Sequence, residues 1–195
     1  VEQTGARIHF RGLSAAQSVR MIQRIDYHRE LVSADVSVHQ LHLCEVDIAD
    51  FDSQCHVIPP LRTPADRDAL RKAVADGTID AICSDHQPHE PDAKAAPFPS
   101  TAPGISGLET LLPLTLKLVA EGVLDLPRAL ALLTSGPARI LGLPLGSLEP
   151  GAMGDVCIFD PRVQWVPGPD TLVSRGHNSP FLGWELSGRV THTLL

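Results

Sequence analysis

The sequence has few aromatic residues, no long apolar run and no excess of basic charge. Phe, Trp and Tyr together make up 4% of its 195 residues. No apolar run approaches the roughly 20 residues that a membrane-spanning helix needs. The formal net charge is -7, and no basic face of the kind that binds nucleic acid is evident. We therefore expect neither a nucleic-acid partner nor a membrane location.

Cysteine is also sparse, and its spacing is irregular. The four cysteines are Cys44, Cys55, Cys83 and Cys157, and no pair of them forms a C-x-x-C motif. A chain of this length and composition, 43% hydrophobic and 20% charged, is typical of a globular protein and not of a small disulfide-rich domain. We expect buried free thiols in place of disulfides or a zinc cluster, and a cytoplasmic location.

The stretch that carries most chemical information is a short apolar run followed by an acid and two histidines. Residues 79–83 are mostly apolar and lead into Asp85, His86 and His89. Such a run is typical of a buried strand, and parallel α/β folds place their chemistry at the carboxyl ends of strands. Asp85 could bind a metal ion or transfer a proton, and the histidines could act as ligands or donors. The alternative is structural: Asp85 caps the next turn and the histidines bond the backbone.

Strand and helix patterns alternate along most of the chain. Apolar runs predict strands at 6–10, 31–38 and 79–83, and helical periodicity predicts a helix at 15–30 with Ser14 as its N-cap. Thr63 followed by Pro64 predicts the start of a helix that ends near residue 75. Further helices are expected at 107–121, 127–134 and 137–141, the last capped by Ser135, and short strands at 155–160, 163–166 and 183–191. This order indicates an α/β fold.

Several motifs in one order resemble the dihydroorotases of the amidohydrolase superfamily. The segment S-D-H-Q-P-H at 84–89 resembles their T-D-H-A-P-H, and G-L-E-T at 107–110 is the same in both. The segment P-P-L-R at 59–62 resembles the end of N-P-P-L-R. Residues 135–143 and 151–156 resemble the closing helix and the small β-domain of amidohydrolases. The resemblance covers nearly the whole chain.

This resemblance implies a fold and a division of the chain. We expect the C-terminal half of a TIM-type (β/α)8 barrel at residues 1–145 and part of a small β-domain at 146–195. A complete barrel usually needs about 250 residues, and the sequence starts at Val1 without an initiator methionine. We therefore expect a piece of a longer protein, with the His-x-His metal pair of the first barrel strand outside it.

The resemblance also assigns roles to individual residues. Asp85 matches a carboxylate that binds the metal and moves a proton, and His89 matches a residue that contacts the substrate carboxylate. The backbone near Pro103 and Gly104 matches a further part of that substrate contact. These retained positions are what an active enzyme would show.

Three places depart from the family pattern, and one of them, Val38 and Gln40 in place of a proline and a histidine, is expected to be a matter of local structure. A metal-binding histidine of the family falls at Gly12, which has no side chain to offer a metal. Arg11 beside it carries a permanent positive charge that would repel a dication. His9 lies three residues back, on the opposite face of a strand, and is not expected to replace the ligand. Ile58 stands where the family has a substrate-binding asparagine, and it offers no hydrogen bond.

These departures favour a dihydroorotase-like subunit of pyrimidine biosynthesis that is catalytically inactive. The resemblance implies that it assembles with the aspartate carbamoyltransferase catalytic chain as a hetero-oligomer, and we expect no cofactor. The alternative is an active zinc dihydroorotase that interconverts carbamoyl-aspartate and dihydroorotate. A hydantoinase or an allantoinase is a third interpretation, but P-P-L-R and G-L-E-T favour dihydroorotase.

Overall fold

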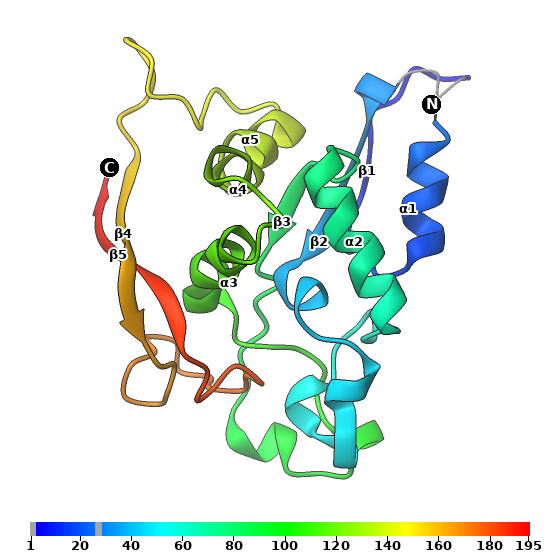
Figure 1. Cartoon of the computed structure of the whole chain (residues 1–195), viewed down its shortest axis with the longest axis vertical. Coiled ribbons are helices and arrows are strands. Elements are labelled where there is room, and N and C mark those ends of the chain that lie inside the picture. Colours follow the sequence, from blue (N-terminus) through cyan, green and yellow to red (C-terminus); the bar gives the residue numbers. More distant parts are fainter. Residues whose placement is uncertain (1–2, 26–28) are drawn as a thin grey trace.

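Three short parallel strands form the centre of the molecule. The computed structural model describes residues 3–25 and 29–195. Its first sheet has the order β1-β2-β3, with β1 at Ile8–Phe10, β2 at Val32–Ser37 and β3 at Ala81–Cys83 (Figure 1). Because both pairings are parallel, the carboxyl ends of all three strands lie at the same edge of the sheet.

Two helices connect these strands and pack against each other on the outside of the sheet. Helix α1 (Ala16–Gln23) joins β1 to β2, and α2 (Pro64–Asp76) joins β2 to β3 (Figure 1). A (β/α)8 barrel is built by repeating this unit of a strand, a helix and a second, parallel strand. The predicted α/β fold is confirmed, with strands shorter than the sequence pattern indicated.

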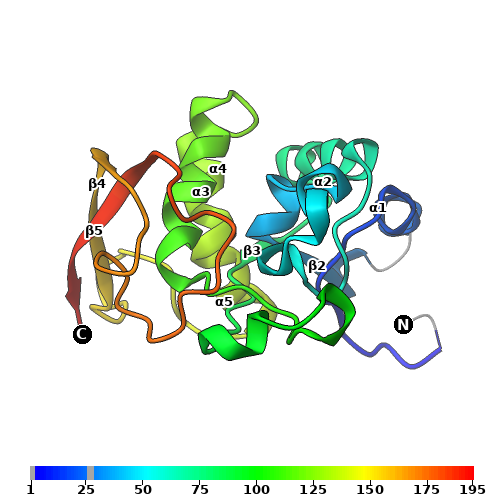
Figure 2. The ribbon, with the colours of Figure 1, turned by 90° about the horizontal axis from the view of Figure 1, so that it is seen from below.

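The next helices lie between β3 and a two-stranded antiparallel ribbon (Figures 1 and 2). They are α3 (Leu108–Ala120), α4 (Leu126–Leu133) and α5 (Ser135–Leu141). Helix α4 packs against β3, and α3 packs against the ribbon strand β5 (Leu186–Leu194). The strands predicted at 155–160 and 163–166 are one strand, β4 (Val156–Trp165), because a register shift interrupts the pairing without ending it.

Short 3-10 helices fill much of the remaining backbone. The segment at 90–106 contains two of them and is otherwise irregular. In the described part of the chain these segments are Arg29–Leu31, Val38–Leu41, Glu45–Phe51, Ser53–Cys55, Pro91–Lys94 and Phe98–Ser100.

The start of α2 confirms a local prediction, and the start of α1 corrects one. Thr63 caps α2 and forms a reciprocal capping box with Asp66. Helix α1 begins one residue later than predicted, at Ala16, and neither Ser14 nor the N-cap Ala15 caps it with a side chain. Instead the Ala16 amide donates to Asp66 Oδ1 at 2.8 Å. The carboxylate of Asp66 in the next helix therefore has the capping role that was predicted for Ser14.

Two further predictions about local structure need correction. Helix α1 ends at Gln23, well before the predicted end at residue 30, and residues 26–28 of that prediction lie outside the described residues. Helix α5 begins at Ser135 itself, so that residue is inside the helix and not its cap.

The hydrophobic core runs from the parallel strands into the C-terminal segment. Phe181 and Leu186 are buried in the same cluster as Val36, Leu70 and Ile82. The division at residues 145 and 146 stays a prediction, since apolar packing crosses it. Among the described residues, no helix is both long and apolar enough to cross a membrane.

The cysteines are free, but only two of the four are buried. Cys44 and Cys55 are buried, Cys83 is half-buried and Cys157 is exposed. The expectation of buried thiols is therefore wrong for Cys157, which lies on the solvent-facing ribbon strand β4.

Candidate functional site

Asp85 lies just beyond the carboxyl end of β3, and three side chains donate to its carboxylate. Its φ is +45°, a left-handed conformation that aspartate tolerates better than most residues. Oδ1 accepts hydrogen bonds from Arg11 at 2.8 Å and Gln87 at 3.3 Å, and Oδ2 accepts one from Ser37 at 3.4 Å. The side chain is only 9% exposed. Asp85 is thus a buried carboxylate with an arginine as its counter-ion.

Gly12 lies at the end of β1, and the neighbouring strand holds its backbone. The Gly12 amide donates to Asp35 Oδ1 at 2.6 Å, while Asp35 Oδ2 accepts from His9 Nε2 at 3.0 Å. The φ of Gly12 is +68°, and the nearest atom to a Cβ built there is Pro59 Cδ at 3.8 Å. The structure therefore brings Arg11, Gly12 and Asp85 to one place but supplies no ligand at Gly12.

His39 is a site residue that the sequence analysis did not single out. It lies in the turn after β2, is 1% exposed, and neither ring nitrogen has a hydrogen-bond partner. Burial lowers its pKa to about 4, against a smaller opposite effect from the negative charge of Asp85. Its place directly after a predicted strand, like that of Asp85, was the available signal. It is a neutral imidazole close to Asp85 with both nitrogens free.

These residues do not make a zinc site by themselves. Catalytic zinc sites in proteins have three protein ligands and an open position. Among residues 3–25 and 29–195, no three His, Cys, Asp or Glu side chains are grouped so that they could hold a metal ion. Asp85 is engaged by a guanidinium, and Gly12 has no donor. The donor set in this chain therefore does not fit the zinc of the resembled enzymes.

The segment around Ile58 lies against Gly12. The bond between Ile58 and Pro59 is cis, Pro59 Cδ is the atom that faces Gly12, and Gln40 Nε2 donates to Pro59 O at 2.9 Å. Ile58 is 66% exposed, so an apolar side chain faces outward where the resemblance implies an amide. Gly12 and Ile58, two positions that depart from the resembled pattern, come from neighbouring segments.

His89, Pro103 and Gly104 lie close together in the structure. His89 Nε2 lies 3.0 Å from Pro103 O, and the Gly104 amide donates to His56 O at 2.8 Å. Asn178 joins the two loops: its Oδ1 accepts from the His89 amide at 2.7 Å, and its Nδ2 donates to Gly104 O at 3.0 Å. The polar groups expected to bind a carboxylate are thus bonded within the chain, and their substrate role stays a prediction.

His86 has a structural role. Its Nδ1 accepts from the amides of Gly107 at 3.1 Å and Leu108 at 3.3 Å, at the start of α3. These amides have no partner inside the helix, so the imidazole caps it. For His86 the structural alternative holds.

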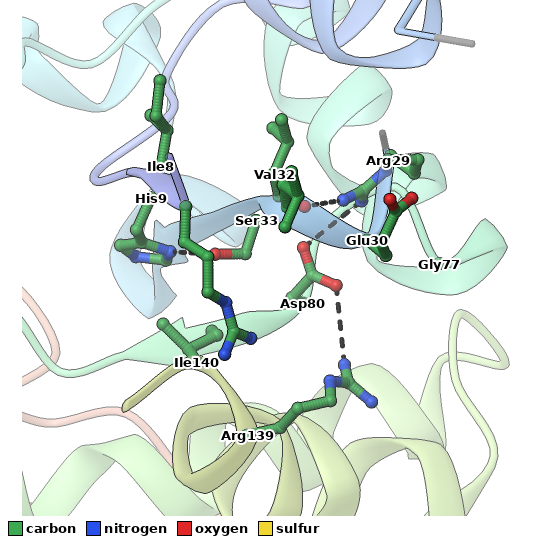
Figure 3. Close-up of a pocket in the computed structure, with 12 residues that line it drawn as sticks. Ile8, His9, Arg29, Glu30, Val32, Ser33, Gly77, Asp80, Arg139 and Ile140 are labelled. Atoms are coloured by element: carbon green, nitrogen blue, oxygen red, sulfur yellow. Dashed lines mark hydrogen bonds and ion pairs between the residues drawn. The ribbon is translucent and has the colours of Figure 1, made fainter. Parts of the chain in front are cut away.

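A cavity lies at the other end of the strands. It has a volume of about 500 Å³ and is lined in part by His9, Arg29, Asp80 and Arg139 (Figure 3). Arg29 and Arg139 reach the two oxygens of Asp80 at 3.3 and 3.5 Å. Asp80 precedes β3, and residues at this amino end of a barrel contribute to stability, whereas catalysis takes place at the carboxyl end. We infer that these ion pairs hold α5 against the sheet.

The comparisons with known proteins identify the family. The Amidohydrolase family model matches residues 19–195. The chain belongs to the amidohydrolase family. A dihydroorotase-like protein of Pseudomonas aeruginosa is 49% identical over 195 residues, which is all of this chain and 46% of that protein. A dihydroorotase of Geobacter sp. is 42% identical over 194 residues, again 46% of its length.

Solved structures of amidohydrolases share the fold. The L-hydantoinase of Arthrobacter aurescens superposes with a TM-score of 0.90 at 25% identity, covering 99% of this chain and 44% of that one. A D-hydantoinase gives a TM-score of 0.84 at 23% identity. The predicted resemblance to dihydroorotase and the barrel fold are confirmed. The chain spans about half the length of the relatives that it matches.

Proposed function

We propose that this chain is part of a dihydroorotase-like protein of pyrimidine biosynthesis that lacks dihydroorotase activity and assembles with aspartate carbamoyltransferase. Family membership and the similarity to dihydroorotase-like proteins and dihydroorotases support the pathway. The partner is inferred from residues 83–89, which resemble a subgroup of dihydroorotase-like chains that have lost the metal site and serve as structural partners of aspartate carbamoyltransferase. Four free cysteines fit the reducing cytoplasm that we propose as its location.

The ion pair of Arg11 with Asp85 is the observation that carries the loss of activity. The resemblance gives Asp85 two tasks, holding a metal and moving a proton. A guanidinium 2.8 Å from Oδ1 opposes both, because it cannot be deprotonated at ordinary pH and it occupies one carboxylate oxygen. A metal would have to displace Arg11 and would still lack a ligand at Gly12.

The test uses the complete protein, purified with and without the transferase catalytic chain. We expect the two chains to co-elute as one complex, the transferase to lose activity when its partner is removed, and no turnover of dihydroorotate. A transferase that elutes at its own size with full activity would contradict the partner role. About one zinc ion per chain together with dihydroorotate turnover would contradict the inactive role.

One observation favours the alternative, an active zinc dihydroorotase. His39 is buried with both ring nitrogens free, and a buried polar group without a partner is costly unless a ligand completes it. Substituting His39→Ala separates the two functions. In a zinc enzyme this substitution would remove both the bound zinc and the activity. In the proposed subunit the zinc content and the dihydroorotate turnover would be the same before and after the substitution.

A further inference from the structure

A second, smaller cavity lies beside the loop at 90–106, on residues that the proposed function does not use. Its volume is about 140 Å³. The titratable side chains that line it are all basic: His89, Lys94, Arg175 and His177. The chain as a whole has a formal net charge of -7, so this concentration of basic groups is unusual for it.

Lys94 is the deepest of these groups. It is 5% exposed, and its Nζ donates to Ser53 O at 3.1 Å. Among the described residues no carboxylate lies within ion-pair distance of it. Burial lowers its pKa, and Asp52 opposes this from a longer range. Because a buried charge without a partner is unfavourable, an anion beside Lys94 would stabilise this arrangement.

Arg175 and His177 also line the cavity, and within the part of the chain that the structure describes neither side chain has a hydrogen bond or an ion pair. Close packing fixes the backbone between and after them. A Cβ at Gly176 would lie 2.6 Å from the His89 amide nitrogen, so only glycine allows this approach. Asn178 then bonds the same amide at 2.7 Å. The two free donors are therefore held at the cavity by residues that pack against the loop.

Gln54 also lines this cavity. Its Oε1 is buried and has no partner. A fully ionised oxyanion such as sulfate has nothing to donate to this oxygen, whereas hydrogen phosphate carries one P–OH group. A water molecule in the liquid occupies about 30 Å³, and binding sites for drug-sized ligands start near 300 Å³. The cavity volume of about 140 Å³ lies between these values and therefore suits a small ion.

We propose that this cavity binds a small oxyanion with an acid hydrogen, of the hydrogen phosphate class. Lys94, Arg175 and His177 donate to its oxygens, and Gln54 Oε1 accepts its hydrogen. The site is separate from Asp85 and Gly12. It does not depend on whether the protein catalyses a reaction.

Calorimetric titration of the complete protein with inorganic phosphate, and separately with sulfate at equal ionic strength, tests this proposal. We expect saturable binding of about one phosphate per chain and weaker binding of sulfate. Arg175→Gln should weaken phosphate binding by about tenfold or more, as expected for loss of a charge-assisted hydrogen bond. Arg20→Gln is the matched control, because it makes the same charge change at an exposed position of α1.

The variant Gln54→Leu tests whether the acid hydrogen of the bound phosphate contributes to the preference for this ion. It should remove the preference for phosphate over sulfate. Lys94→Met should abolish binding of both ions, and if it fails to fold, the variants of Arg175 and Gln54 still decide. The proposal is overturned if the wild-type protein binds neither ion, or if Arg175→Gln binds phosphate as tightly as the wild type. Equal wild-type affinity for the two ions would overturn the role of Gln54.

Discussion

Replacing Gly12 by histidine tests whether the backbone, as well as the missing side chain, keeps a metal ligand from this position. The φ of Gly12 is +68°, a region that costs an L-residue about 1–2 kcal/mol. A Cβ would meet only Pro59 Cδ at 3.8 Å, which is ordinary contact. We therefore expect Gly12→His to fold with a loss of about 1–2 kcal/mol, which lowers the melting temperature by a few degrees.

The same variant should not recover zinc. Arg11 would still donate to Asp85, so a metal would meet both its charge and an occupied carboxylate. The double variant Arg11→Ser with Gly12→His removes that competitor, and we expect it to bind zinc more tightly than the single variant. The measurements are thermal unfolding and metal content of the complete protein purified in the presence of zinc.

Gly142→His is the matched control for the backbone cost. Gly142 has the same φ of +68°, with no atom within 4 Å of a Cβ built there, and it ends α5 away from the site. The backbone argument is refuted if Gly142→His loses stability while Gly12→His does not. Stoichiometric zinc and robust dihydroorotate turnover in Gly12→His alone would refute the roles given to Arg11 and Ile58.

Three further predictions concern stability. Arg11→Gln should cost about 1 kcal/mol, since an exposed arginine loses a partly screened pair with a buried carboxylate, whereas Arg20→Gln should cost almost nothing in the same urea titration. Burial lowers the pKa of His42 to about 4 from 6.5, so the unfolded chain binds this proton more readily. This shift contributes about 3 kcal/mol to the free energy of unfolding, fully present above pH 6.5 and lost as the pH decreases towards 4. The free energy of unfolding of His42→Gln, measured by urea titration, should therefore depend less on pH over this range. Asn178→Ala breaks hydrogen bonds to two loops and should cost about 2–4 kcal/mol and speed proteolysis at 90–106; unchanged cleavage would contradict that bridging role.

The features that the sequence predicted well are decided by neighbouring residues. Thr63, Pro64 and Asp66 define the start of α2 within four positions, because a cap and its amides are local. The polar residues after β3 were predicted at a strand end for the same reason. Apolar runs and caps thus gave the α/β order before any contact was known.

The features that the sequence could not predict join distant segments. Arg11 and Asp85 are 74 positions apart, and Asn178 bonds the amide of a residue 89 positions earlier. The capping of α1 by Asp66 crosses 50 positions. No periodicity in the sequence marks such distant pairs. The sequence therefore indicated Ser14 as the cap of α1, whereas the carboxylate of Asp66 on the next helix caps it.

Arg11 also explains how Asp85 remains stable in this chain although Gly12 offers no side chain to a metal. A carboxylate that is 9% exposed needs donors or positive charge to remain stable. In a metal enzyme the cation fills that need only while it is bound, and its affinity depends on every ligand. Arg11 is part of the chain and supplies charge at any metal concentration, with Ser37 and Gln87 completing the donors. The presence of Asp85 is therefore consistent with a purely structural role, and it becomes evidence for catalysis only if Arg11 can be displaced.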